Sequence, residues 1–514
     1  MIAAFIASLF VSLGIGTAVV YLVFPPPKSG SAGTLLRLSA GGGFGIGITS
    51  CIYFICLLAG FIRYAVAAEI VLGLILGLLC LSRFRKGGEG APAELDPSVH
   101  GATLSVTGSR LRTLIAFVFS VELIASLVSF FIAYLKEPHG RWDAWLIWNM
   151  HARFLFRGGT EWREAFASGL DWSHWDYPLL LPLSIARGWT YLGSEGFPVP
   201  AVMGFLFTFL ILGLLAGSLA LLRSRTQGYL AAMVLMGTPF FIFMGSSQFA
   251  DIPLAFFILA TIIMLFFPAR MPAHSARPLI LAGLAAGLCA WTKNEGLLFV
   301  PVVMVSLLIP AAVHGGWKGA LQRTAWFLAG ALPILAIVIT FKLRLAPAND
   351  LMAGFSPGAL SGDLFDWGRY WTIARAFFVT GLSFTQGLID VRVGMQINPG
   401  AVSILLLAVY LLLTGVKPDA QARTGLIETT SAVCLTLAGY FFVYVVTPLD
   451  LNYHLATSLN RLFLQLWPGV IFLIFIIAAS PEQLSPPGDA PAILTAQKQP
   501  PLQRRKQKKI LEAK

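Results

Sequence analysis

The sequence has few charged residues and few cysteines, and both shortages limit what the protein can be. Only 12% of its 514 residues are charged, whereas soluble domains carry about 25%. That excludes an ordinary soluble domain. The five cysteines lie in apolar segments, are odd in number and show no CxxC spacing. We interpret them as packing residues, which say little about the redox compartment.

The net charge of +12 does not indicate a nucleic-acid partner. The basic residues are spread over short loops and a C-terminal tail. Nucleic-acid-binding proteins instead gather Lys and Arg on one domain face or along one helix. We therefore expect no nucleic-acid binding.

Apolar residues dominate what is present. They make up 57% of the chain, and the mean hydropathy is +0.78. A helix that spans a bilayer needs about 20 mostly apolar residues. The sequence thus predicts an all-α polytopic membrane protein with about thirteen transmembrane helices. We expect them at residues 2–24, 40–61, 65–81, 113–135, 199–222, 228–244, 252–267, 278–290, 296–309, 325–341, 401–415, 425–446 and 462–479.

The distribution of charge predicts how these helices are oriented. We read the first segment as a retained helix rather than a cleaved signal peptide, and Lys28 follows it. The positive-inside rule then places the N-terminus outside and the C-terminus in the cytoplasm. In this topology 22 of the 36 Lys and Arg residues are cytoplasmic, against 8 of the 24 Asp and Glu residues.

Three regions follow from this pattern. Residues 1–112 form an N-terminal three-helix membrane segment and a cytoplasmic loop. Residues 113–480 form the main membrane domain, with two long outer segments at 136–198 and 342–400 that contain short interfacial helices. Residues 481–514 form a Pro-, Gln- and Lys-rich cytoplasmic tail that we expect to be disordered. The tail would orient the chain and touch anionic lipid.

The first outer segment is the most informative stretch. Seven of the 13 tryptophans lie between Trp142 and Trp189, and the run from Arg141 to Arg157 reads RWDAWLIWNMHARFLFR. At helical spacing this run predicts an amphipathic surface helix with an apolar stripe and a polar face. The stripe contains Trp145, Trp148, Ala152 and Phe156, and the polar face contains Asn149, Arg153 and Arg157. An aromatic anchor at the membrane surface is the alternative reading of the tryptophans.

Asp143 does not fit the anchor reading. A carboxylate just after a spanning helix and beside Trp142 has no anchoring use, and it needs Arg141 or a substrate as a partner. Further along, DWSHWDYPLLLPL supplies Asp171, His174, Asp176 and Tyr177 before an apolar helix restarts. His151, His174 and these carboxylates could hold a divalent metal, but no HxxxH or DxD spacing favours it. We assign no cofactor.

Further ionisable residues fall on the same predicted outer side. Asp251 opens a helix in SSQFADIPLAFF, where it could simply favour the helix dipole. Lys293 and Glu295 lie in the turn of WTKNEGLLF. They could form a salt bridge that stabilises this turn, or they could contact a phosphate. His454 and Arg461 precede the last predicted helix, where Arg461 could bind a phosphate or a lipid headgroup.

These motifs occur in an order that resembles a known superfamily. An aspartate opens the first large outer loop, and Asp-Tyr-Pro-Leu-Leu, QFADIPLAFF and AGLAAGLCAWTKNEGLLF follow it. Together they resemble the integral-membrane glycosyltransferases of the GT-C superfamily, near protein O-mannosyltransferases and lipid A aminoarabinose transferases. The resemblance covers about residues 113–480. This chain departs from the common pattern because Ala144, not a second acid, follows Asp143.

The resemblance implies an inverting transferase that takes a sugar from a polyprenyl-phosphate donor and passes it to a hydroxyl of a glycan, lipid or protein. Asp143 matches the catalytic acid of the first loop, which acts as general base. An alcohol is a weak nucleophile until a carboxylate takes its proton, and the departing phosphate needs fixed positive charge. The expected substrate- and donor-binding residues are Trp142, Arg153, His174, Asp176, Tyr177, Asp251, Lys293, Glu295, His454 and Arg461.

Two other functions stay open at this point. A ligase or polymerase of lipid-linked glycans would depend on outer arginines, with Asp143 dispensable. A polyprenyl-lipid transporter would place its charges near the bilayer midplane rather than at one rim. The motifs favour a bacterial inner membrane with the site on the periplasmic face.

Overall fold

The computed structural model describes residues 2–24, 30–85, 106–166, 173–270, 276–349, 362–383, 400–419 and 422–481. These ranges are helical and contain no named strand. One isolated antiparallel bridge joins Val416 to Ala478. The predicted all-α class is therefore confirmed, while Lys28, Asp171 and nearly all of the predicted tail lie outside the described residues.

Seventeen α-helices lie in the described ranges. In the N-terminal half they are α1 (Ile2–Val23), α2 (Gly30–Leu58), α3 (Ala65–Arg85), α4 (Val106–Lys136), α5 (Asn149–Arg157), α6 (Leu180–Leu192), α7 (Pro198–Leu222), α8 (Arg225–Met236) and α9 (Pro239–Ser246). In the C-terminal half they are α10 (Asp251–Phe266), α11 (Ala276–Thr292), α12 (Asn294–His314), α13 (Trp317–Arg344), α16 (Trp367–Ser383), α17 (Gly400–Thr414), α18 (Arg423–Val446) and α19 (Leu451–Ile477).

The chain is an integral membrane protein. Ten helices among the described residues are long and apolar enough to cross a membrane, and the bent pair α8–α9 would make eleven. Twelve of the thirteen predicted segments each fall on one helix, although α11 and α17 are short, and the segment 228–244 covers both α8 and α9, which meet at 68°. The predicted count of thirteen spans is thus not confirmed. The bend has a local cause, because Thr238 is extended and Pro239 begins the next helix.

Two boundaries differ from the sequence prediction. Helix α13 runs to Arg344, so Lys342 belongs to this helix and not to an outer loop. Helix α19 begins at Leu451, so His454 and Arg461 lie within it rather than before it. The reason is that Leu455, Leu459 and Leu462 recur at helical spacing and are buried, which extends the apolar face toward the N-terminus.

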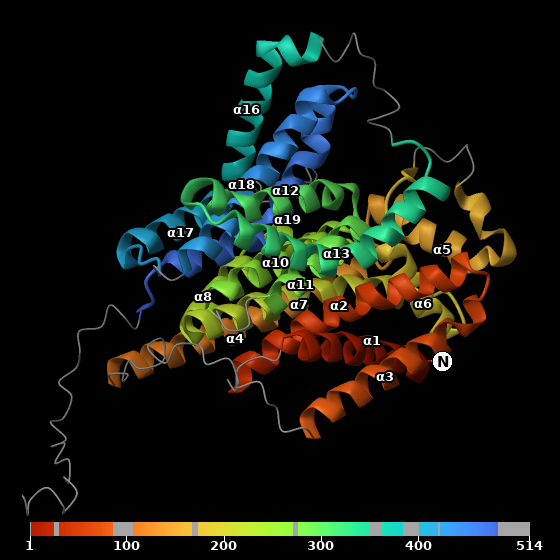
Figure 1. The fold of residues 1–514 in the computed structure, drawn as a ribbon. Coiled ribbons are helices and arrows are strands. Elements are labelled where there is room, and N and C mark those ends of the chain that lie inside the picture. The colour runs from red at the N-terminus through yellow and green to blue at the C-terminus, as the bar shows by residue number, and fades with distance from the viewer. Residues whose placement is uncertain are drawn as a thin grey trace, which may run out of the picture.

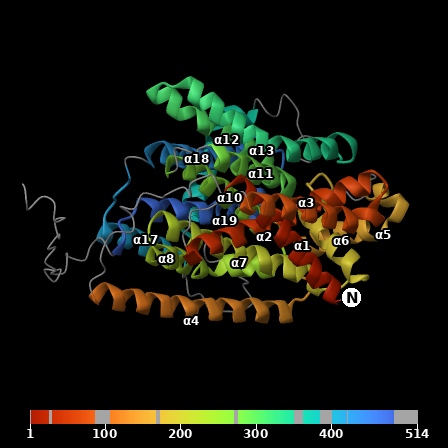
Figure 2. The same cartoon turned by 60° about the horizontal axis from the view of Figure 1, so that its bottom comes forward.

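Helix α10 lies in the middle of the bundle, and α4 lies along one edge (Figures 1 and 2). Almost all of α10 is buried, whereas most of α4 is exposed on the outside of the bundle. Helices α5 and α6 lie at one end of the bundle in both views, and α8 and α17 lie at the other. The site described next is built at the α5–α6 end, from the first residue of α10 and its neighbours.

The three N-terminal helices pack into the same core as the later ones. Helices α1 and α2 approach each other closely at Gly16 and Gly45, where an added Cβ would come within 2.4 Å of Gly45 N and 1.8 Å of Ser12 O. Such close glycine contacts are typical of helices packed within a membrane. Residues of α1 and α2, such as Phe5 and Phe44, belong to one buried cluster with residues of α10 and α19.

Candidate functional site

Five charged residues that are far apart in the sequence meet at the α5–α6 end of the bundle. We call them the charge cluster: Asp143, Asp251, Lys293, Glu295 and Arg461. All five were predicted as site residues. The structure brings them into one network of ion pairs, so their meeting does not depend on a substrate.

Asp251, the first residue of α10, is the centre of the charge cluster. Its side chain is completely buried. Oδ1 accepts hydrogen bonds from Lys293 Nζ at 3.1 Å and from Gln465 Nε2 at 2.7 Å. Oδ2 accepts from Arg461 Nη2 at 2.7 Å and from Nε at 3.1 Å. With both oxygens occupied and no exposed surface, Asp251 is suited to positioning the two cations rather than touching a substrate.

Asp143 pairs with Arg461, and not with its sequence neighbour Arg141. Arg461 Nη1 lies 2.7 Å from Asp143 Oδ2, while Arg141 pairs with Glu137. The Asp143 side chain is 17% exposed. Arg461 thus joins the partly open carboxylate of Asp143 to the closed one of Asp251.

Lys293 lies between α11 and α12 with its ammonium between two carboxylates. Nζ is 3.1 Å from Asp251 Oδ1 and 2.7 Å from Glu295 Oε1. Burial by itself would lower the pKa of Lys293, but Asp251 and Glu295 raise this pKa above its ordinary value. Lys293 therefore stays charged, and its charge is already matched by protein carboxylates.

The backbone around Asp143 is irregular. Asp143 directly precedes a π-helical turn at Ala144–Trp148, and such turns often occur at functional sites. Two nearby residues, His174 and Gln248, have positive φ values of 55° and 63°. Left-handed backbone is costly for residues other than glycine, and it persists where the surrounding contacts fix it. The surrounding contacts therefore hold the backbone at His174 and at Gln248 in a defined shape.

A second network holds the Asp-Tyr-Pro motif against the bundle. Asp176 is buried, and its Oδ2 accepts hydrogen bonds from Asn294 Nδ2 and Asn349 Nδ2, both at 2.7 Å. Lys342 donates to the Asp176 carbonyl and to Asn294 Oδ1. Asp176 therefore fastens the first outer segment to α12 and α13.

Aromatic rings connect the two networks. Tyr177 stacks on Trp148 with ring centroids 5.6 Å apart and on His174 at 5.0 Å. Lys293 Nζ lies 6.0 Å from the centre of the Tyr177 ring. Burial raises the pKa of the Tyr177 hydroxyl well above its ordinary value, so this residue stays neutral. Tyr177 thus forms an aromatic wall beside Lys293 of the charge cluster, and Trp148 and His174 stack on its ring.

Three predicted site residues lie apart from the charge cluster. Trp142 is 66% exposed and contacts Trp145. His454 contacts Thr447 through Nδ1 at 3.0 Å and packs on the Tyr444 ring. Arg153 lies 3.4 Å from Glu195 and faces a separate pocket, which is described below.

Three residues that complete these networks were not predicted from the sequence. They are Lys342, Tyr440 and Gln465. Gln465 follows Arg461 by four residues, so the two share one face of a helix, and this spacing was a usable signal. Tyr440 donates to Gln465 Oε1 at 2.9 Å, a contact between two helices that no sequence pattern indicates.

His151 is a buried, neutral histidine in the same outer segment. It stacks on Trp175 with ring centroids 3.7 Å apart, and its Nε2 lies 3.3 Å from Ser173 Oγ. Burial lowers the pKa of His151 to about 3 from the ordinary 6.5. Between these two values the unfolded chain binds one more proton than the folded protein, so stability falls as the pH falls below 6.5.

We therefore expect the wild type to lose about 2 kcal/mol of stability through His151 between pH 7.5 and pH 5. The variant His151→Phe keeps a stacking ring without a titrating group and should show a smaller loss. Apparent Tm values at both pH values, at one fixed heating rate, would measure this. The exposed His314, replaced by Gln, is the control and should lose as much as the wild type. An equal pH effect in His151→Phe would contradict the assignment.

Within the ranges that the structure describes, no three His, Cys, Asp or Glu side chains are grouped so that they could hold a metal ion. Comparison with known proteins gives no further guide, since no protein-family model, curated protein or solved structure matches the chain. The class that the fold defines is an all-helical integral membrane protein with a charge cluster at one end.

Proposed function

We propose that the protein is an inverting glycosyltransferase that moves a sugar from a polyprenyl-phosphate donor to an acceptor hydroxyl. The observation that carries this proposal is the environment of Asp143. Its carboxylate is partly exposed, and Arg461 is its ion-pair partner among the described residues. The two other carboxylates of the charge cluster have more partners: Lys293 and Gln465 contact both of them, and Arg461 also contacts Asp251. Asp143 is thus the carboxylate of the charge cluster with the fewest protein partners, which leaves it free to accept a proton from a substrate.

Asp143 acts in this proposal as the general base. The acceptor oxygen attacks the anomeric carbon from the face opposite the phosphate, and the bond between that carbon and the phosphate oxygen breaks. Asp143 takes the hydroxyl proton, and the polyprenyl phosphate leaves with the bonding electron pair. A positioned base of this kind typically accelerates a reaction by about 10²–10⁴-fold.

Arg461 links the proton transfer to the leaving group. The charge cluster contains three carboxylates and two cations, so it carries one excess negative charge while Asp143 is ionised and is neutral once Asp143 is protonated. Once Asp143 is protonated, the charge of Arg461 is no longer matched by this partner. It is then available to the phosphate, which gains a negative charge as it leaves.

Two details of location belong to the same proposal. The active site would lie on the periplasmic face of a bacterial inner membrane, with the N-terminus outside and the C-terminus in the cytoplasm. The donor would enter from the bilayer, and membrane lipids would surround the helices. The meeting of Asp143, Asp251, Lys293 and Arg461 at one end of the bundle supports a site at a membrane rim rather than at the midplane.

Mass spectrometry of glycolipids, glycans and polyprenyl-phosphate sugars from a strain that lacks the gene would test the proposal. We expect the deletion to lose one sugar from a glycan and to accumulate a polyprenyl-phosphate monosaccharide. Wild type should restore the product, whereas Asp143→Asn at matched expression should form it about a hundredfold more slowly. The control is Asp366→Asn, an exposed carboxylate outside the charge cluster, and it should restore the product fully.

Other outcomes would contradict the transferase. Full rescue by Asp143→Asn would remove Asp143 from the chemistry, and loss of a whole glycan chain would then favour a ligase or polymerase. Unchanged glycans together with a changed distribution of polyprenyl lipid across the membrane would favour a transporter.

A further inference from the structure

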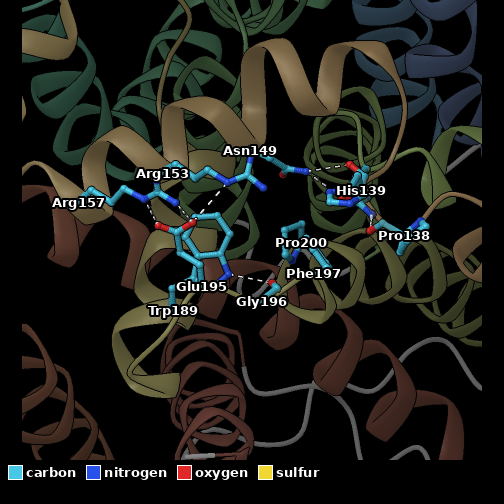
Figure 3. A pocket seen from close by; sticks show the side chains of 11 residues that line it. Pro138, His139, Asn149, Arg153, Arg157, Trp189, Glu195, Gly196, Phe197 and Pro200 are labelled. Atoms are coloured by element: carbon cyan, nitrogen blue, oxygen red, sulfur yellow. Dashed lines mark hydrogen bonds and ion pairs between the residues drawn. The ribbon is translucent and has the colours of Figure 1, made fainter.

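A pocket of about 370 Å³ lies between α5 and the loop that joins α6 to α7. Figure 3 shows Arg153 and Arg157 reaching toward Glu195 from α5, with Trp189, Phe197 and Pro200 across from them. The volume falls within the range of small-molecule sites, about 300–1,000 Å³. None of the residues of the charge cluster lines this pocket, which we call the α5–α7 pocket.

The α5–α7 pocket carries one unmatched positive charge. Glu195 binds Arg157 through two oxygens, with Arg157 Nη2 2.8 Å from Oε2. The same carboxylate approaches Arg153 Nε at 3.4 Å. Two guanidinium groups thus share one carboxylate, and the Arg153 side chain is 34% exposed. In the charge cluster, by contrast, every cation faces more than one carboxylate.

The same pocket also offers an acceptor for a hydroxyl group. Asn149 is 4% exposed, and its Nδ2 donates to the His139 carbonyl at 3.2 Å and to Gln248 Oε1 at 2.9 Å. Its Oδ1 is buried and has no hydrogen-bond partner among the residues that the structure describes. A buried acceptor without a donor costs free energy, which a ligand hydroxyl would recover. Phe197 and Pro200 add apolar surface for a ring.

The wall of the pocket is also the segment that leads to Asp143. Gln248 Nε2 donates to the Pro138 carbonyl at 3.0 Å, and Arg141 N donates to the Ser247 carbonyl at 3.2 Å. Gly140, with φ of 73°, packs so closely that an added Cβ would lie 2.7 Å from Ser247 O. A ligand in the pocket therefore lies a short stretch of chain away from the Asp143 carboxylate.

We propose that the α5–α7 pocket binds the acceptor, and that this acceptor is a sugar residue bearing one negatively charged group. One anionic group matches the one unmatched charge of Arg153 and Arg157, ring hydroxyls match Asn149 Oδ1, and the ring matches Phe197 and Pro200. The role as acceptor rests on the proposed function. The binding itself does not.

The test measures binding of four probes to the purified full chain in nanodiscs of zwitterionic lipid, by ligand-observed NMR titration. The probes are glucose 6-phosphate, glucuronate, glucose and inorganic phosphate. We expect the two anionic sugars to bind about tenfold more tightly than glucose, which is the effect of one charge-assisted contact. Inorganic phosphate should also bind more weakly than glucose 6-phosphate.

Charge variants separate recognition from misfolding. Arg153→Gln and Arg157→Gln should each weaken glucose 6-phosphate about tenfold. Glu195→Gln should instead strengthen it, because it leaves both guanidinium groups unmatched, and a misfolded variant could not bind more tightly. Arg63→Gln removes an exposed arginine outside the pocket and should change nothing.

Four results would overturn the inference. Glucose or inorganic phosphate could bind as tightly as glucose 6-phosphate, or the three pocket variants could have no effect. The fourth is loss of all sugar binding when the protein is placed in nanodiscs that contain phosphatidylglycerol, which would assign the pocket to a lipid headgroup. Asp143→Asn should bind the anionic sugars like the wild type but not transfer to them. If the wild type binds the anionic sugars in this pocket but transfers no sugar to them, the proposed transferase activity is refuted and the binding site is not. If it transfers a sugar to them without binding them in this pocket, the proposed binding site is refuted and the transferase activity is not.

Discussion

Replacing Lys293 by methionine should cost about 3–5 kcal/mol of stability, because it leaves buried carboxylates without their cation. Lys293 is only 5% exposed in its side chain, and it lies between Asp251 and Glu295. Methionine has a similar length and no charge, so the loss of charge dominates over the loss of volume. After the change, Asp143 and Asp251 would share Arg461, and Glu295 would have lost the cation it contacts in the charge cluster.

A second substitution should restore part of this loss. In Lys293→Met with Asp251→Asn, the buried anion at the centre of the charge cluster is also removed, and Asn can still receive a hydrogen bond from Gln465. We expect the double variant to be more stable than Lys293→Met by at least about 1 kcal/mol, which is a coupling typical of residues in one ion-pair network. The single variant Asp251→Asn should cost less than Lys293→Met, because each cation then keeps one carboxylate.

Unfolding in mixed micelles titrated with sodium dodecyl sulfate would give these free energies, with apparent Tm at one heating rate as a second readout. Lys318→Met is a matched control, since Lys318 is exposed at the start of α13. A Lys293→Met variant as stable as this control would show that the carboxylates are protonated or solvated, and the charge cluster would then not be an ion-pair network. Additive effects of the two substitutions would contradict the contact between Lys293 and Asp251.

Hydropathy predicted the helices well because the bilayer demands long apolar runs, and all thirteen predicted segments fall on helices. It failed where the ends of a helix were set by side-chain packing or by a local break in the backbone. The run from Leu451 to Arg461 looks polar by average, yet one face of it is buried along the bundle. The residue pair that breaks α8 from α9, Thr238 and Pro239, lies inside a run that is apolar throughout.

The members of the charge cluster could be predicted one by one, but their pairing could not. An ionisable residue at the end of an apolar run is conspicuous, which identified Asp143, Asp251, Lys293 and Arg461. Arg141 lay nearest to Asp143 in the sequence and was a natural partner for it. The partner in the structure is 318 residues away, because the approach of two helices is set by packing over their whole length.

A second buried ion pair was not predicted from the sequence, and its loss should also have a large effect on stability. Glu69 in α3 and Arg187 in α6 are both buried, and they form a bidentate pair at 2.7 Å and 2.6 Å. Arg187 also donates to the Ser8 carbonyl of α1, and Tyr191 donates to Glu69. One ion pair thus fastens the N-terminal helices to the helix that follows the Asp-Tyr-Pro motif.

Each single change, Glu69→Leu or Arg187→Met, should cost about 3–5 kcal/mol, because it leaves the other charge buried and unpaired. The double variant should be within about 1 kcal/mol of the wild type or more stable, since apolar side chains of similar volume often replace a buried pair without loss. The same micelle titration would measure this, with Arg63→Met as an exposed control. A double variant as unstable as either single one would mean that the polar contacts to Ser8 and Tyr191 matter more than the pair.

The double variant also distinguishes two roles of this ion pair, which are fastening helices together and positioning the site. If it is stable and the glycan of the deletion strain is restored, the pair only fastens α3 to α6. If it is stable but the product is lost, then the pair positions α6, and through the Asp176 network it positions the wall of the charge cluster. Because a buried ion pair often adds little net stability compared with apolar side chains, positioning explains the retained pair better, and we expect the second result. The N-terminal helices would then be part of the working site, although none of their residues belongs to the charge cluster.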